Sequence, residues 1–170
     1  SDQLPTLGVS QIAALSTDVA RTLSSDQIAV LTTLQILGMR TAQIAAISTI
    51  GIAALTATQA ASLSSAAASA LTTRQVAAVE TEDLVALSTS AVRALGSAQL
   101  WALSTTQIAA LSTDQIVALT TAQVQVLTSA QLNELTATQV PSLETRDVAA
   151  ISTSAMRGIS TVQQIGRAHV

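Results

Sequence analysis

The sequence predicts an all-α fold: a solenoid, or superhelix, of short capped helices with one helix in each eight-residue repeat. Two observations support this prediction. An aliphatic residue, usually Leu, recurs at every eighth position from Leu7 to Ile159 without an insertion or deletion. In fifteen of these twenty octads Ser or Thr follows it directly, and in thirteen a Gln occupies the fifth place. Such fixed spacing is typical of repeats that stack on one another, because one longer repeat would interrupt the stack.

Each octad carries the signals that begin a helix. In Leu103-Ser-Thr-Thr-Gln-Ile-Ala-Ala110, which shows the consensus, Ser104 at the second place is followed three residues later by Gln107. This is the capping-box pattern, in which the hydroxyl accepts from the N3 amide and the Gln side chain accepts from the N-cap amide. Leu103 before the cap and Ile108 at N4 form a hydrophobic staple. A helix of about six residues is therefore expected in every octad.

The period of eight decides how these helices are joined. One continuous helix is excluded, because eight residues at 3.6 per turn would rotate the Leu stripe by about 80° per octad. A β-solenoid would keep its phase, but it would place the first and sixth residues on opposite faces and fill its strands with Ala. With no linker for a helical hairpin, we expect a polygonal spiral with first-place and sixth-place residues along its axis. The small eighth-place residues suit a crowded inner corner.

We predict three segments: an N-terminal lead-in at 1–6, the octapeptide-repeat solenoid at 7–164, and a non-native tail at 165–170, whose sequence resembles a translated sequencing adapter. Ala60 and Ala68 replace the usual sixth-place residue, so the core should be thinnest there. Pro141 lies inside a predicted helix, where it removes an amide donor and should push Val140 toward extended geometry. A local kink is expected at that point.

The composition argues against several functions. Seven Arg, no Lys and a net charge of −3 give no basis for phosphate-driven nucleic-acid binding. Polar residues interrupt every octad, so we expect no membrane insertion. There is no Cys, and the single histidine, His169, lies in the predicted tail. We therefore assign no catalytic, metal or cofactor-binding residue, expect no cofactor and no enzyme activity, and do not expect a small-molecule ligand.

Two segments, Glu80–Leu95 and Glu144–Ile159, resemble each other beyond the consensus. Both begin with acidic residues, which are Glu80, Glu82 and Asp83 in the first and Glu144 and Asp147 in the second. These acids can be interpreted as a site for a cation or a partner. The alternative is that they interact favourably with the helix dipole in a first turn, and no known calcium-loop spacing is present.

Trp101 and Arg93 occupy the variable seventh place, which should face outward, and they are the candidate contacts for a partner. The alternatives are a Trp that covers an aliphatic groove and an Arg that only adds solubility. Thr at the third place should form rows along the spiral, which suits an ice or glycan ligand. A Thr beside a helix cap is also ordinary.

The run from Leu111 to Leu119, Leu-Ser-Thr-Asp-Gln-Ile-Val-Ala-Leu, resembles octapeptide tracts of large repetitive bacterial proteins that are often surface-exposed or secreted. This resemblance implies a structural or adhesive role. The unit also resembles the opening helix of transcription activator-like effector repeats, but the period is eight and the base-reading pair is absent. DNA binding is therefore not carried over.

Together these observations predict a structural repeat protein, a filament subunit, stalk or spacer, whose partner is itself in a head-to-tail homopolymer. The array continues into the tail without a polar cap, which would leave core surface for self-association. An extracellular or cell-surface location is favoured. The alternative is a solenoid binding module that displays its fourth-place and seventh-place residues to a peptide, glycan or ice surface.

Overall fold

The computed structural model describes residues 4–157, and the predicted tail, His169 and residues 158–164 lie outside this range. The described residues are all-α, with no β-strand among them. Short helices follow one another: η1 Leu4–Thr6, α1 Val9–Ala14, α2 Thr17–Thr22, α3 Ser25–Ala29, α4 Thr33–Gly38, α5 Thr41–Ala46, α6 Thr49–Ala53, α7 Ala57–Ala61, α8 Ser65–Ala70, α9 Thr73–Ala78, α10 Thr81–Ala86, α11 Thr89–Ala94, α12 Ser97–Trp101, α13 Thr105–Ala110, α14 Thr113–Ala118, α15 Thr121–Gln125, α16 Ser129–Asn133, η2 Val140–Ser142, α17 Thr145–Ala150 and α18 Thr153–Arg157. One helix per octad is therefore confirmed.

The helices begin where the capping boxes predict. Helix α13 is representative: the Ser104 hydroxyl accepts from the Gln107 amide at 3.1 Å, and the Ser104 amide donates to Gln107 Oε1 at 2.8 Å. Most helices then end in an extended first-place residue; Leu111, for example, has φ −55° and ψ 138°. No residue with positive φ occurs between residues 4 and 157. Each corner consists of an extended residue and an N-cap, so glycine is not needed to turn the chain.

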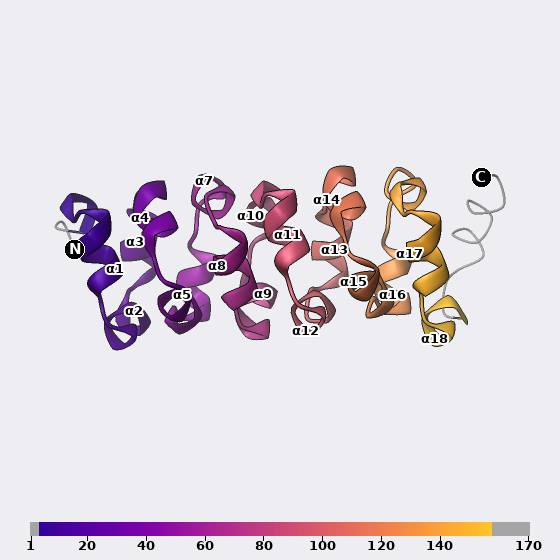
Figure 1. The fold of residues 1–170 in the computed structure, drawn as a ribbon, viewed down its shortest axis with the longest axis horizontal. Helices are drawn as coiled ribbons and strands as arrows, with labels where there is room; N and C mark the ends of the chain where they lie inside the picture. Colours follow the sequence, from indigo (N-terminus) through magenta and orange to yellow (C-terminus); the bar gives the residue numbers. More distant parts are fainter. Residues whose placement is uncertain (1–3, 158–170) are drawn as a thin grey trace.

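Three octads complete one turn of the superhelix. Each helix packs against the third helix further along the chain, as α1 does with α4 and α10 with α13. Figure 1 shows the result: a straight, elongated stack of turns, with α1 and α18 at opposite ends. The predicted polygonal spiral is confirmed, and its number of sides, which the sequence analysis left open, is three.

A single apolar core follows the axis of this spiral. First-place and sixth-place residues such as Leu103 and Ile108 are buried, with exposed fractions of 4% and 0%. Where Ala60 and Ala68 take the sixth place, they are also buried. The core therefore continues from turn to turn, which is the nearest-neighbour architecture expected of a solenoid.

Two local expectations need correction. The octad beginning at Leu135 forms a turn and the 3-10 helix η2, so Val140 is the first residue of a 3-10 helix rather than an extended residue. The tighter helix accommodates Pro141, which has no amide to donate. Eighth-place residues such as Ala110 are only half-buried. The crowded inside of the corner is occupied instead by the fifth-place side chains.

Candidate functional site

The corners of the superhelix contain its most regular polar contacts. At the corner of α13, Gln107 Nε2 donates to the carbonyl of Val79 at 2.7 Å and to that of Val76 at 3.2 Å. Both carbonyls lie at the C-terminal end of α9, one turn earlier, where the last carbonyls of a helix lack their usual intrahelical partners. The Val76 carbonyl also accepts from the Val79 amide at 3.2 Å. The Gln107 side-chain amide accepts the Ser104 N–H through Oε1. One side chain thus caps the start of one helix and the end of another.

This arrangement recurs at ten corners of the described solenoid, namely wherever the fifth-place residue from Gln35 onward is Gln. The bridging residues are Gln35, Gln43, Gln59, Gln75, Gln99, Gln107, Gln115, Gln123, Gln131 and Gln139, and each donates to a carbonyl 28 residues earlier. All ten are buried. The sequence analysis identified these residues as caps but missed the second bond. We call such a contact a corner bridge.

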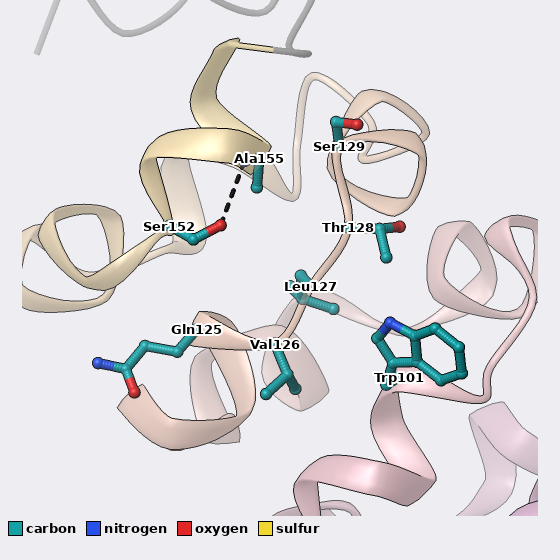
Figure 2. Close-up of a pocket in the computed structure, with 8 residues that line it drawn as sticks. All are labelled: Trp101, Gln125, Val126, Leu127, Thr128, Ser129, Ser152 and Ala155. Carbon is teal, nitrogen blue, oxygen red and sulfur yellow. Dashed lines mark hydrogen bonds between the residues drawn. The ribbon is translucent and has the colours of Figure 1, made fainter.

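Open hollows occur at two corners where the fifth-place residue is not Gln. One is lined by Leu127 and Ala155, which occupy the places of the acceptor and the bridging Gln in a regular corner, together with Trp101. Figure 2 shows the indole at one side of this hollow and Ala155 with Ser152 at the other. The other hollow is lined by Leu55 and Asp83, which stand in the same relation. In both places the corner lacks the amide that elsewhere fills it.

The predicted contact residues do not form one patch. Trp101 is 62% exposed at the end of α12, so its outward orientation is confirmed. Arg93 is exposed on α11, and it is not among the residues that line the hollow beside Trp101. The acids of α10 line a separate hollow. Trp101 and the acids therefore line different hollows, and Arg93 lines neither of them. The Trp101 side chain lies beside an incomplete corner, which its sequence position did not predict.

At the acidic corner of Asp147, the carboxylate has partners within the chain. Asp147 has an exposed fraction of 2%, and its Oδ1 accepts from the Thr121 hydroxyl at 2.8 Å. The Nε of Arg146 lies 2.9 Å from Glu144 Oε2 and 3.6 Å from Asp147 Oδ1. A hydroxyl of the preceding turn and a guanidinium of the same helix thus compensate this buried carboxylate.

The corresponding corner at Asp83 lacks both partners. Asp83 has an exposed fraction of 4%, and Glu82 stands where the other segment has Arg146. Ala57 stands where the preceding turn would supply Thr121. Burial, and then the negative charges of Glu80 and Glu82, raise the pKa of the Asp83 carboxyl above its ordinary value of 3.8. Among the described hydrogen bonds and ion pairs, none involves the Asp83 side chain.

Two general properties bear on the choice of site. Between residues 4 and 157, no three His, Cys, Asp or Glu side chains converge closely enough to hold a metal ion. In the same part of the chain, every helix falls short of the length and apolarity that crossing a bilayer would require.

Among known proteins, similarity is found for the repeat unit. No curated protein and no solved structure matches the chain. A family model described as the ALTTAQ repeat matches residues 76–113 and 110–145. The matched region runs from α9 to the first residue of α17 and includes regular corner bridges such as those of Gln107 and Gln115. The octapeptide unit predicted from the sequence is therefore confirmed, and residues 76–145 are similar to the ALTTAQ repeat.

Proposed function

We propose that this protein is a structural repeat protein, a stalk, spacer or filament subunit that acts through its length and through self-association rather than catalysis. The observation that supports this proposal most is the corner bridge. Every bridge ties the N-terminal end of one helix to the C-terminal carbonyls of the turn before it, across a continuous apolar core. Adding octads adds turns of the same kind, so length scales with repeat number.

The same contacts support self-association. A turn presents its fifth-place side chains, which are Gln in most octads, on one axial face and its first-place carbonyls on the other, so two turns can stack whether they belong to one chain or to two. In the first described turn, Gln11 and Gln27 accept from their own caps, Gly8 and Ser24, through Oε1. Both precede Gln35, which is the first described Gln that donates to carbonyls of an earlier turn. A head-to-tail contact of this kind does not close on itself, and such contacts build filaments.

The proposal is tested with the full chain by sedimentation velocity and electron microscopy over a concentration series. We expect mass and rod length to increase with concentration. The variant Gln27→Glu keeps a side chain that can complete the capping box but replaces the amide donor with an acceptor, so it should weaken association. Gln125→Glu is the matched control, because Gln125 is exposed at a seventh place on the side of the superhelix.

A chain that stays monomeric at every concentration would contradict the proposal. So would equal association of the Gln27→Glu and Gln125→Glu variants, because the axial amide would then have no part in the contact. A cell-surface or extracellular location remains part of this proposal, and labelling of intact cells with an antibody to the chain would test it.

One observation favours the second candidate, a solenoid that binds a ligand. The hollows beside Trp101 and Asp83 interrupt the pattern of bridged corners, and both open where the fifth-place residue is not Gln. A site on the side of the superhelix is compatible with axial stacking, so one protein can do both.

A further inference from the structure

The hollow beside Asp83 differs from every bridged corner in its chemistry. It joins Leu55 and Ala57 of one turn to Glu80, Glu82 and Asp83 of the next, with a volume of about 480 Å³. We call this group of residues the Asp83 corner. At a bridged corner an amide would fill the space and donate to the first-place carbonyl. Here the fifth-place side chain is a shorter carboxylate, which has no hydrogen to donate when ionised.

The buried carboxylate of Asp83 is the strongest indication that this hollow binds a group from outside the chain. The residue is almost completely buried, with an exposed fraction of 4%, and its side chain lines the hollow. No hydrogen bond or ion pair compensates it within the described residues. Buried carboxylates are normally paired, because burial removes their hydration and only a hydrogen bond or an ion pair can compensate that loss. A donor that enters the hollow from outside would restore that balance.

The groups around Asp83 favour a cation with several donors. Glu80 and Glu82 lie close enough to raise the pKa of Asp83, so the local field is negative. The carboxylates do not converge on one point in the way that a metal requires. A planar guanidinium suits such dispersed acceptors better, because its five N–H groups point in different directions and can donate to more than one carboxylate.

The Asp147 corner already contains a guanidinium beside two equivalent carboxylates. There the guanidinium of Arg146 bridges Glu144, at 2.9 Å, and Asp147, at 3.6 Å. Glu80 and Asp83 occupy the equivalent places in the earlier segment, while Glu82 replaces the arginine. The Asp83 corner therefore keeps the two acceptors of this arrangement and lacks its cation.

We propose that the Asp83 corner is a binding site for a guanidinium group that comes from outside the chain, either on an arginine side chain of a polypeptide or in a small guanidino compound. The guanidinium lies between Asp83 and Glu80 as Arg146 lies between its two carboxylates. Glu82 adds negative charge at the rim. This site is independent of axial self-association.

The test is a titration of the full ¹⁵N-labelled chain, followed by two-dimensional NMR at constant ionic strength. The first probe is arginine capped as its acetyl methylamide, which presents a guanidinium without free termini. We expect saturable shifts of the amides of Glu82, Asp83 and Thr56. Capped lysine and calcium chloride are the comparison probes, and both should produce weaker effects at equal concentration.

Matched variants separate a site from general attraction to acidic residues. The double variant Glu82→Arg, Ala57→Thr gives the Asp83 corner the same internal partners as the Asp147 corner. Its affinity for capped arginine should therefore fall by about tenfold or more, which is the loss expected for one or two charge-assisted hydrogen bonds. The reverse pair, Arg146→Glu with Thr121→Ala, should create a second site at Asp147. Circular dichroism checks that both variants keep the helical fold.

Each outcome decides the proposal. Absence of saturable shifts overturns it, as does equal binding of lysine or tighter binding of calcium. Unchanged affinity in the Glu82→Arg, Ala57→Thr variant also overturns it, because the site would lie elsewhere. If binding is confirmed, an arginine-centred peptide distinguishes the sources: tighter binding than capped arginine indicates a polypeptide partner, and equal binding indicates a small guanidino compound.

Discussion

The two acidic corners place the same residues in different surroundings. Asp83 and Asp147 each follow a Glu by three residues and each replace the Gln of a corner bridge. Asp147 receives a hydroxyl from Thr121 and a guanidinium from Arg146. Asp83 faces Ala57 and Glu82 at the corresponding places. The comparison shows that the same carboxylate replaces the bridging amide in both corners, but only the Asp147 corner supplies donors for it within the chain.

The largest effect should come from turning a bridged corner into an acidic one. In Gln107→Glu the carbonyls of Val76 and Val79 lose the side-chain amide donor and face a buried carboxylate instead, although the Val76 carbonyl keeps the Val79 amide. Leaving buried polar groups without partners should lower the free energy of unfolding by about 2–4 kcal/mol. Urea denaturation measures this change.

Gln125→Glu is the matched control, because the same substitution at an exposed seventh-place residue should change stability by less than about 0.5 kcal/mol. Equal effects of the two substitutions would show that corner bridges contribute little to holding the turns together.

A smaller effect, of opposite sign, is expected when the acidic corner is turned into a bridged one. Asp83→Gln supplies an amide that can donate to the Leu55 carbonyl and accept from the Glu80 amide, as Gln107 does one turn later. It also removes an unpaired buried charge. We expect the free energy of unfolding to rise by about 1–2 kcal/mol.

Asp147→Gln provides the comparison for that variant. At this corner the substitution removes the contacts with Thr121 and Arg146, so the gain should be smaller. If both variants gain equally in denaturant unfolding, the different partners of the two carboxylates have no energetic consequence.

The sequence could predict the parts of this fold that depend on neighbours in the chain. A cap such as Ser104 and a staple such as that of Leu103 and Ile108 act within one octad, so their pattern is visible directly. The corner bridge is not local, because Gln107 reaches carbonyls 28 and 31 residues earlier. Its partners can be found only once the number of octads per turn is known.

The same limit explains why the acidic corners could not be told apart from the sequence. Both segments were recognised as acidic first turns, and the sequence shows Glu82 in place of Arg146. The other difference, Ala57 in place of Thr121, lies 26 residues before the Asp, so its relation to the corner is not visible in the sequence. Trp101 was correctly expected to be exposed. Its position beside the incomplete corner of Ala155 depends on packing between turns, and no spacing in the sequence indicated it.

The most subtle consequence of the comparison is a pH dependence of stability at the Asp83 corner. Because the pKa of Asp83 is raised in the folded chain, the folded state holds this proton more tightly than the unfolded state. The stability that Asp83 contributes is therefore fully present below about pH 3.8, its ordinary value, and is lost as the pH rises through the folded-state pKa.

Asp83→Asn should remove this contribution to the slope of stability against pH. Ala57→Thr should reduce it, since a hydroxyl that donates to the carboxylate favours its charged form. Thermal unfolding of the three proteins from pH 3 to pH 7 gives the slopes. A slope that is the same in all three would mean that Asp83 ionises as freely in the folded chain as in the unfolded one, and that the hollow beside it holds enough water to take the place of a partner.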